Sequence, residues 1–188
     1  MVKISRDQAD SILKPYYDDF VGIMQQAHKE WLELAALKPV LSPRTRVNAI
    51  NDLIRAGVRR VFSSNPDTRI IAMRGLFFLK VGQIAGRFKR LRNSRPSNIP
   101  TYQSGQLEMQ QLSLGRDFER PLIVNIGYTP NKAWDQIKYE ISCVRGRDVL
   151  WSISLSGGLE IESPIEIPVS DIPPQAPKKR VFKKRQNE

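Results

Sequence analysis

Apolar residues recur with a helical period near the beginning of the chain. From Ala9 to Ala35 they fall at intervals of three and four residues, close to the 3.6-residue period of an amphipathic helix. Ser5 and Gln8 have the spacing of a capping box at the start of this helix. Pro15 interrupts the pattern, and because proline removes an amide from the helical ladder, we expect a kink or two abutting helices there.

A second amphipathic helix is predicted over Ser42–Phe62. Ser42 is a suitable N-cap, and Pro43 suits the first helical position, where no amide hydrogen is needed. The apolar residues of this segment form one stripe, and Arg44, Arg55 and Arg59 fall mostly outside it. We therefore expect a helix that is half core and half cationic surface.

After residue 68 the apolar period changes to two, which is typical of strands. The predicted strands are Arg69–Arg74, Leu76–Val81, Ile84–Leu91, Pro121–Tyr128, Ile137–Val144 and Val149–Leu155. Gly146 lies in the short turn that should join the last two as a hairpin. Residues 93–118 predict a long loop with a short helix at Leu107–Leu112. Helices followed by a largely antiparallel sheet define an α+β fold.

The domain organisation follows from the same pattern. Residues 1–163 should form a single α+β domain, in which 1–62 are helical and 69–161 form the sheet with its 93–118 loop. Residues 164–188 are rich in proline and then in lysine and arginine, which predicts an extended linker and a disordered basic tail. The chain has no long apolar run and no signal peptide pattern, and its single cysteine excludes an intrachain disulfide. We expect a cytoplasmic protein.

Positive charge is concentrated in one part of the chain. The whole protein carries a formal net charge of +11, and residues 40–100 alone hold 13 lysines and arginines against Asp52 and Asp67. The sequence pI of about 10.0 agrees with this excess. A charge distribution this uneven produces a local positive field that attracts polyanions, so nucleic acid is the expected partner class.

The densest basic segment runs from Gly86 to Arg95. On a strand, Arg87 and Lys89 share one face while Phe88 and Arg90 share the other, so neither face can be fully buried and an edge strand is expected. Arginine suits phosphate, and Phe88 would stack on a base. The alternative is a charged edge that only prevents aggregation. The candidate nucleic-acid-binding residues are Arg55, Arg59, Arg87, Phe88, Lys89, Arg90, Arg92 and Arg95.

No catalytic, cofactor or metal motif accompanies the basic segment. His28 is the only histidine and lies beside the first apolar stripe, so we expect a structural residue, and Cys143 in an apolar strand should be inert. One histidine and one cysteine cannot build a zinc site, and Asp135, Lys138 and Glu140 match no metal template. No phosphate-binding glycine loop is present. A metal-independent nuclease that uses arginine, lysine and tyrosine would leave no motif.

Several segments resemble, in the same order, those of a group of small bacterial proteins. They are Ser42–Ile54, Arg59–Phe62, Gly86–Leu91, Arg95–Thr101, Val124–Tyr128 and Val149–Ser152, so the resemblance covers roughly residues 40–155. Members are encoded beside Xre-type repressors and ImmA/IrrE-like metallopeptidases in mobile-element or phage-defence loci. The resemblance implies a component of a regulatory or toxin–antitoxin-like module, with a repressor or peptidase as partner. Many members carry an acidic residue where this chain has Arg92.

Three functions follow from these observations. The leading expectation is a non-enzymatic protein that binds nucleic acid, or a nucleic-acid-bound partner, through its basic surface. The second is a toxin-like nuclease that is independent of metal or depends on it weakly. The third is an interaction module that clasps an acidic partner protein, because a basic surface also suits such a partner.

Overall fold

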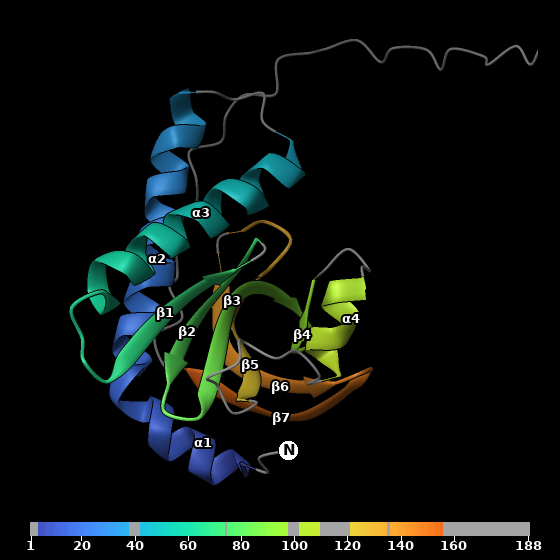
Figure 1. Ribbon diagram of the computed structural model, residues 1–188. Helices are drawn as coiled ribbons and strands as arrows, with labels where there is room; N and C mark the ends of the chain where they lie inside the picture. Colours follow the sequence, from blue (N-terminus) through green and yellow to red (C-terminus); the bar gives the residue numbers. More distant parts are fainter. Residues whose placement is uncertain are drawn as a thin grey trace, which may run out of the picture.

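The computed structural model describes residues 4–37, 42–73, 75–97, 102–109, 121–134 and 136–155. The predicted α+β class is confirmed, because long helices precede a seven-stranded, mostly antiparallel sheet (Figure 1). The predicted linker and basic tail, residues 164–188, lie outside the described part of the chain. Within that part, no helix is long and apolar enough to cross a membrane.

The helical part begins as its sequence predicts. Its elements are α1 (Arg6–Leu13), a 3₁₀ turn η1 (Lys14–Tyr16), α2 (Tyr17–Leu37) and α3 (Pro43–Phe62). The Ser5 hydroxyl accepts a hydrogen bond from the Gln8 amide at 3.2 Å, and the Gln8 side chain accepts one from the Ser5 amide at 2.9 Å, which confirms the capping box. Pro15 lies in η1 and separates the two abutting helices. Ser42 caps α3 by accepting from Thr45 N at 3.2 Å.

The sheet follows the predicted strands closely. Its strands are β1 (Thr68–Met73), β2 (Leu76–Val81), β3 (Ile84–Arg92), β4 (Arg95–Pro96), β5 (Leu122–Pro130), β6 (Ile137–Arg145) and β7 (Asp148–Leu155). They lie in the order β1-β2-β3-β5-β6-β7, with β4 paired to β3. Neighbouring strands are antiparallel except β3 and β5, which are parallel. The predicted hairpin is confirmed, with Gly146 in its turn at a φ of +59°.

The short helix in the long loop begins earlier than predicted. It is α4 (Tyr102–Glu108), whereas the apolar spacing indicated Leu107–Leu112. Leu107 of this helix is buried and packs in a cluster with Phe78 and Ile123. A single apolar anchor does not specify on which side of itself a helix extends, which explains the misplaced boundary.

The prediction that β3 is an edge strand is wrong. It lies inside the sheet, paired with β5 over Ile84–Arg90 and with β2 over Ile84–Gly86. The charged half of the strand therefore continues beside β5 beyond the end of its pairing with β2. Long cationic side chains on this half have space because β2 no longer pairs with β3 beside them, and not because the strand lies at the edge of the sheet.

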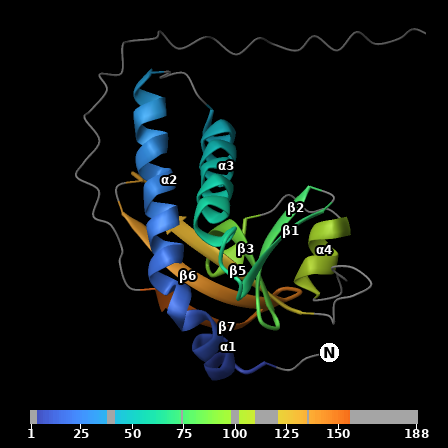
Figure 2. The same cartoon turned by 60° about the vertical axis from the view of Figure 1, so that its left-hand side comes forward.

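The two faces of the sheet are covered differently. The main core lies between one face and the helices α1, α2 and α3, and it includes Phe20, Phe62 and Ile126. A small second cluster containing Phe78 and Leu107 lies on the opposite face, beneath α4. Figure 2 shows α2 and α4 on opposite sides of the sheet. The helix α3 thus brings its polar side close to the charged half of β3, with which it is in contact.

Candidate functional site

Three cations predicted from the sequence surround one small cavity between α3 and β3. Arg55 comes from α3, and Arg87 and Lys89 come from the same face of β3. The cavity measures about 30 Å³, enough for about two water molecules. We call it the cation pocket, and its lining residues are Asn51, Arg55, Gly75, Leu76, Phe77, Arg87, Phe88 and Lys89.

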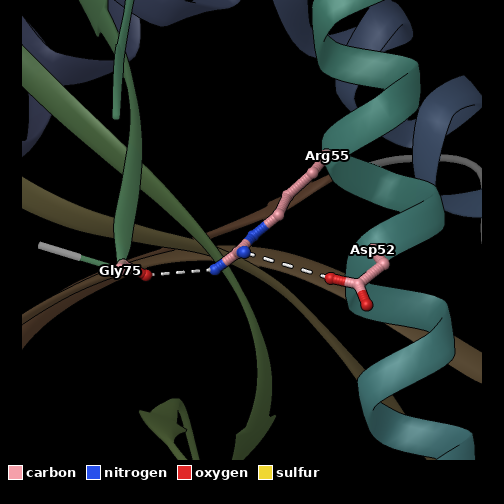
Figure 3. A network of polar contacts seen from close by, with 3 residues as sticks. All are labelled: Asp52, Arg55 and Gly75. Carbon is pink, nitrogen blue, oxygen red and sulfur yellow. Dashed lines mark hydrogen bonds and ion pairs between the residues drawn. The ribbon is translucent and has the colours of Figure 1, made fainter. Parts of the chain in front are cut away.

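Arg55 is held across the mouth of the cation pocket. Its guanidinium donates a hydrogen bond to the Gly75 carbonyl in the β1–β2 turn at 3.4 Å, and it pairs with Asp52 at 3.9 Å (Figure 3). Asp52 lies one turn earlier on α3, and 74% of its side chain is exposed. Because exposed ion pairs are strongly screened, Asp52 neutralises little of the charge inside the pocket. No carboxylate belongs to the described lining of the pocket.

The electrostatics of the cation pocket are unfavourable for its own lysine. Burial and, after it, the positive charges of Arg87 and Arg55 together lower the pKa of Lys89 from its ordinary value of 10.5 to about 8. Arg87 is only 5% exposed. Among the described residues, none forms an ion pair with Lys89. The fold therefore holds positive charge at a point where an anion would be stabilised.

A second cluster of cations forms around Trp134, in the turn between β5 and β6. The guanidinium carbon of Arg46 lies 4.9 Å from the centroid of its ring, and that of Arg90 lies 5.2 Å from it. These distances are typical of cation–π contacts. Trp134 is half-buried and adopts a φ of +64°, a region that side-chain-bearing residues rarely occupy.

Arg46 and Trp134 were missed in the sequence prediction. Arg46 lies in the first turns of α3, between Arg44 and the later arginines that the helical pattern selected, and Trp134 is the aromatic residue of an otherwise polar turn. The available signal was this aromatic residue, because large apolar side chains in polar turns are unusual. Its two arginine partners come from other elements and cannot be read from spacing along the chain.

A buried polar pair lies beneath Trp134. His28 is 3% exposed, which agrees with the structural role predicted for it, and its Nδ1 donates to the Met24 carbonyl at 2.6 Å. Its ring meets that of Tyr128 edge-on at a centroid distance of 4.6 Å. Burial lowers the pKa of His28 and raises that of Tyr128, so both rings stay neutral near physiological pH. Neither His28 Nε2 nor the Tyr128 hydroxyl has a hydrogen-bond partner among the described residues.

The remaining cations of the basic segment lie at the β3–β4 hairpin. Arg92 and Arg95 face each other across a turn whose central residues, Asn93 and Ser94, have φ values of +52° and +57°. Two positive φ values are the signature of a type I′ turn. Both arginines line a cavity of about 280 Å³ that Val144 closes from β6. This cavity is separate from the cation pocket, and the two share no lining residue.

Phe88 does not have the role that its position in the basic segment suggested. It is 4% exposed, and its ring packs against that of Phe20 at a centroid distance of 5.9 Å. Because this contact lies in the main core, the ring is not accessible to a base. Arg59, in contrast, is exposed and its guanidinium lies 5.2 Å from the centroid of Phe77.

The cation pocket and the Trp134 cluster are both built from α3 and β3. The helix α3 supplies Arg46 to the cluster and Arg55 to the pocket, and these residues are about two and a half turns apart, so they lie on opposite sides of the helix. The strand β3 supplies Arg90 to the cluster and Lys89 to the pocket from its two opposite faces. We call these cations, together with Arg59, the basic strip, and its members are Arg46, Arg55, Arg59, Arg87, Lys89 and Arg90.

The described part of the chain gives little support for metal binding or for a reactive thiol. No group of three histidine, cysteine, aspartate or glutamate residues there could hold a metal ion. Glu140 accepts a hydrogen bond from the Ser94 hydroxyl at 2.7 Å, and Asp135 lies outside the described residues. Burial raises the pKa of the Cys143 thiol to about 11, so it remains protonated and unreactive. No known protein family, curated protein or solved structure matches the chain.

Proposed function

We propose that the protein binds nucleic acid through the basic strip, as a non-enzymatic component of a regulatory or phage-defence module. One observation carries this proposal: cations from α3 and β3, which are far apart in the sequence, converge in two clusters, the cation pocket and the Trp134 cluster. Asp52 is the one acidic residue of α3, and its carboxylate is largely exposed. Positive charge concentrated in two such clusters favours a polyanion, in which negative charge repeats along the chain.

The chemistry of the basic strip supports a phosphate backbone as this ligand, because guanidinium groups bind phosphate oxygens in pairs. The ring of Trp134 restrains the guanidinium groups of Arg46 and Arg90 before any ligand arrives. Such restraint lowers the conformational entropy that binding would otherwise cost.

Gel mobility shift and fluorescence anisotropy with labelled DNA and RNA would test this function at a low and a high salt concentration. We expect binding that weakens steeply with salt, and Arg90→Glu should lower the affinity at low salt by about tenfold or more. Trp134→Ala should lower it by about threefold to tenfold, since Arg46 and Arg90 lose their restraint. Lys14→Glu, an exposed charge change at the junction of α1 and α2, is the matched control.

Three results would count against the proposal. They are the absence of any complex at low salt, an affinity that Arg90→Glu leaves unchanged, and an equal loss in Lys14→Glu. Capture of an acidic repressor or peptidase by a protein that binds no nucleic acid would favour the interaction module instead. Shortening of the labelled probe, dependent on the basic strip, would favour the nuclease.

A further inference from the structure

The cation pocket differs from the rest of the basic strip because it is enclosed. Arg59 is exposed and the Trp134 cluster is half-buried, whereas Arg87 in the pocket is only 5% exposed. The pocket forms where β2 leaves β3 after the Leu79–Gly86 pair, and Arg55 closes it by reaching the Gly75 carbonyl (Figure 3). A long nucleic-acid backbone lying on the surface would therefore pass by this pocket and not through it.

The size of the pocket limits what can enter. Its volume of about 30 Å³ holds about two water molecules, so two oxygens of one small anion fit and a continuous strand does not. A phosphate inside a strand carries a nucleoside on both sides, whereas a terminal phosphate has three oxygens free on one side. The shape of the pocket thus favours the end of a strand.

The lining of the pocket matches a terminal phosphate in charge. Two guanidinium groups and one ammonium line it, and guanidinium groups bind phosphate oxygens in pairs. The Asn51 side chain adds a neutral polar group from α3. A phosphate monoester carries nearly two negative charges near neutral pH, against one on an internal phosphodiester. Such a dianion would also offset the repulsion of Lys89 by Arg87 and Arg55, which adds to burial in lowering the pKa of Lys89.

We propose that the cation pocket is a binding site for the terminal phosphate monoester of a nucleic-acid strand, held by Arg55, Arg87 and Lys89. This inference rests on the proposed function, because the adjoining nucleotides would contact other cations of the basic strip. It adds a specificity that the strip alone does not have. The protein distinguishes strands by whether their end carries a phosphate.

The test compares short single-stranded oligonucleotides of one sequence that carry a 5′-phosphate, a 3′-phosphate or hydroxyls at both ends. Their affinities for the full chain are measured by fluorescence anisotropy, with the label at the end opposite the phosphate. We expect one phosphorylated end to bind about tenfold more tightly than the hydroxyl form, as charge-assisted hydrogen bonds in a partly buried site would give. Preference for either end supports the inference, and equal affinity for all three strands overturns it.

Variants distinguish the terminal preference, which the cation pocket should give, from the overall affinity, to which the rest of the basic strip contributes. In Lys89→Met the ratio of phosphate to hydroxyl affinity should fall to about one, whereas Arg90→Glu should weaken all strands by a similar factor and keep the ratio. Lys138→Met, an exposed lysine on β6, should leave the ratio and the affinities unchanged. Arg55→Gln serves as a second pocket variant if Lys89→Met does not fold. A ratio that both pocket variants preserve overturns the inference.

Experiments with inorganic phosphate test whether the cation pocket binds the end of a strand or a free anion. If the pocket binds free phosphate, the wild-type protein should melt at a higher temperature in potassium phosphate than in potassium chloride of equal ionic strength. The melting temperature of Lys89→Met should be the same in both salts. Excess phosphate should also reduce the terminal preference without removing binding of the hydroxyl strand. If no oligonucleotide binds at low salt, the proposed function fails. If strands bind without terminal preference, only the pocket inference fails.

Discussion

Replacement of Lys89 by methionine should stabilise the folded protein while it impairs phosphate binding. Methionine has a similar length and no charge, so it removes the cost of burying an ammonium group beside Arg87 and Arg55. Burial and these charges lower the pKa of Lys89 from 10.5 to about 8. At about 1.4 kcal/mol per pKa unit this corresponds to about 3 kcal/mol, and screening of the half-buried side chain by solvent reduces the expected gain to about 1–3 kcal/mol.

The pH dependence of this gain has a defined sign. Protonated Lys89 destabilises the folded state, and this cost is fully present below the folded-state pKa of about 8 and is lost as the pH rises toward 10.5. The stability difference between Lys89→Met and the wild type should therefore be largest near neutral pH and smaller at about pH 9. Buried tyrosines titrate identically in both proteins, so their contribution cancels in the difference.

Urea unfolding followed by tryptophan fluorescence measures this difference directly. Trp31 is buried in the main core and reports on global unfolding. Lys138→Met, which removes an exposed lysine, should change stability by less than about 0.5 kcal/mol. A loss of more than about 1 kcal/mol in Lys89→Met near neutral pH would refute the reasoning, since Lys89 would then stabilise the fold. A gain that grows with pH would refute it equally.

Three further predictions concern packing and reactivity. Gly127→Ala should destabilise the protein by about 1–3 kcal/mol in urea unfolding, since a Cβ there would clash with the Leu91 side chain and the Lys89 carbonyl oxygen. The control Gly22→Ala, where a Cβ would have no atom within 4 Å, should stabilise α2 by about 0.5–1 kcal/mol. A neutral Gly127→Ala would contradict this close contact. Tyr139→Phe should leave stability unchanged or raise it by up to about 1 kcal/mol, because the buried hydroxyl has no partner among the described residues; a clear loss would reveal one. The Cys143 thiol, with a pKa raised to about 11, should react with a thiol reagent at about pH 8 only in urea, and prompt labelling of the folded chain would argue against its burial.

The fold was largely predictable because most of its signals are local. Capping at Ser5 and Ser42, the break at Pro15 and the two-residue period of the strands depend on neighbours in sequence, and the structure agrees with each. The place of β3 in the sheet was not predictable in the same way. Alternation indicates which side chains share a face, but the neighbours of a strand are set by pairing with distant segments such as β5.

The candidate site was predictable only in part for a related reason. Alternation placed Arg87 and Lys89 on one face of β3, and both line the cation pocket. It also placed Phe88 on the opposite face, but it could not show that the core fills that face. The contacts of Trp134 with Arg46 and Arg90 join three elements, and no spacing along one element predicts them.

The single parallel pairing in the sheet has a consequence for how the protein folds. The strands β1, β2 and β3 follow one another as one antiparallel unit, β5, β6 and β7 form another, and only the β3–β5 pairing joins them. Pairings between distant segments form slowly, because a long loop must close first. Trp134 belongs to the second unit and its partner Arg90 to the first, so their stack should form only when the two units dock. The fluorescence of Trp134 would then mark the last step of folding.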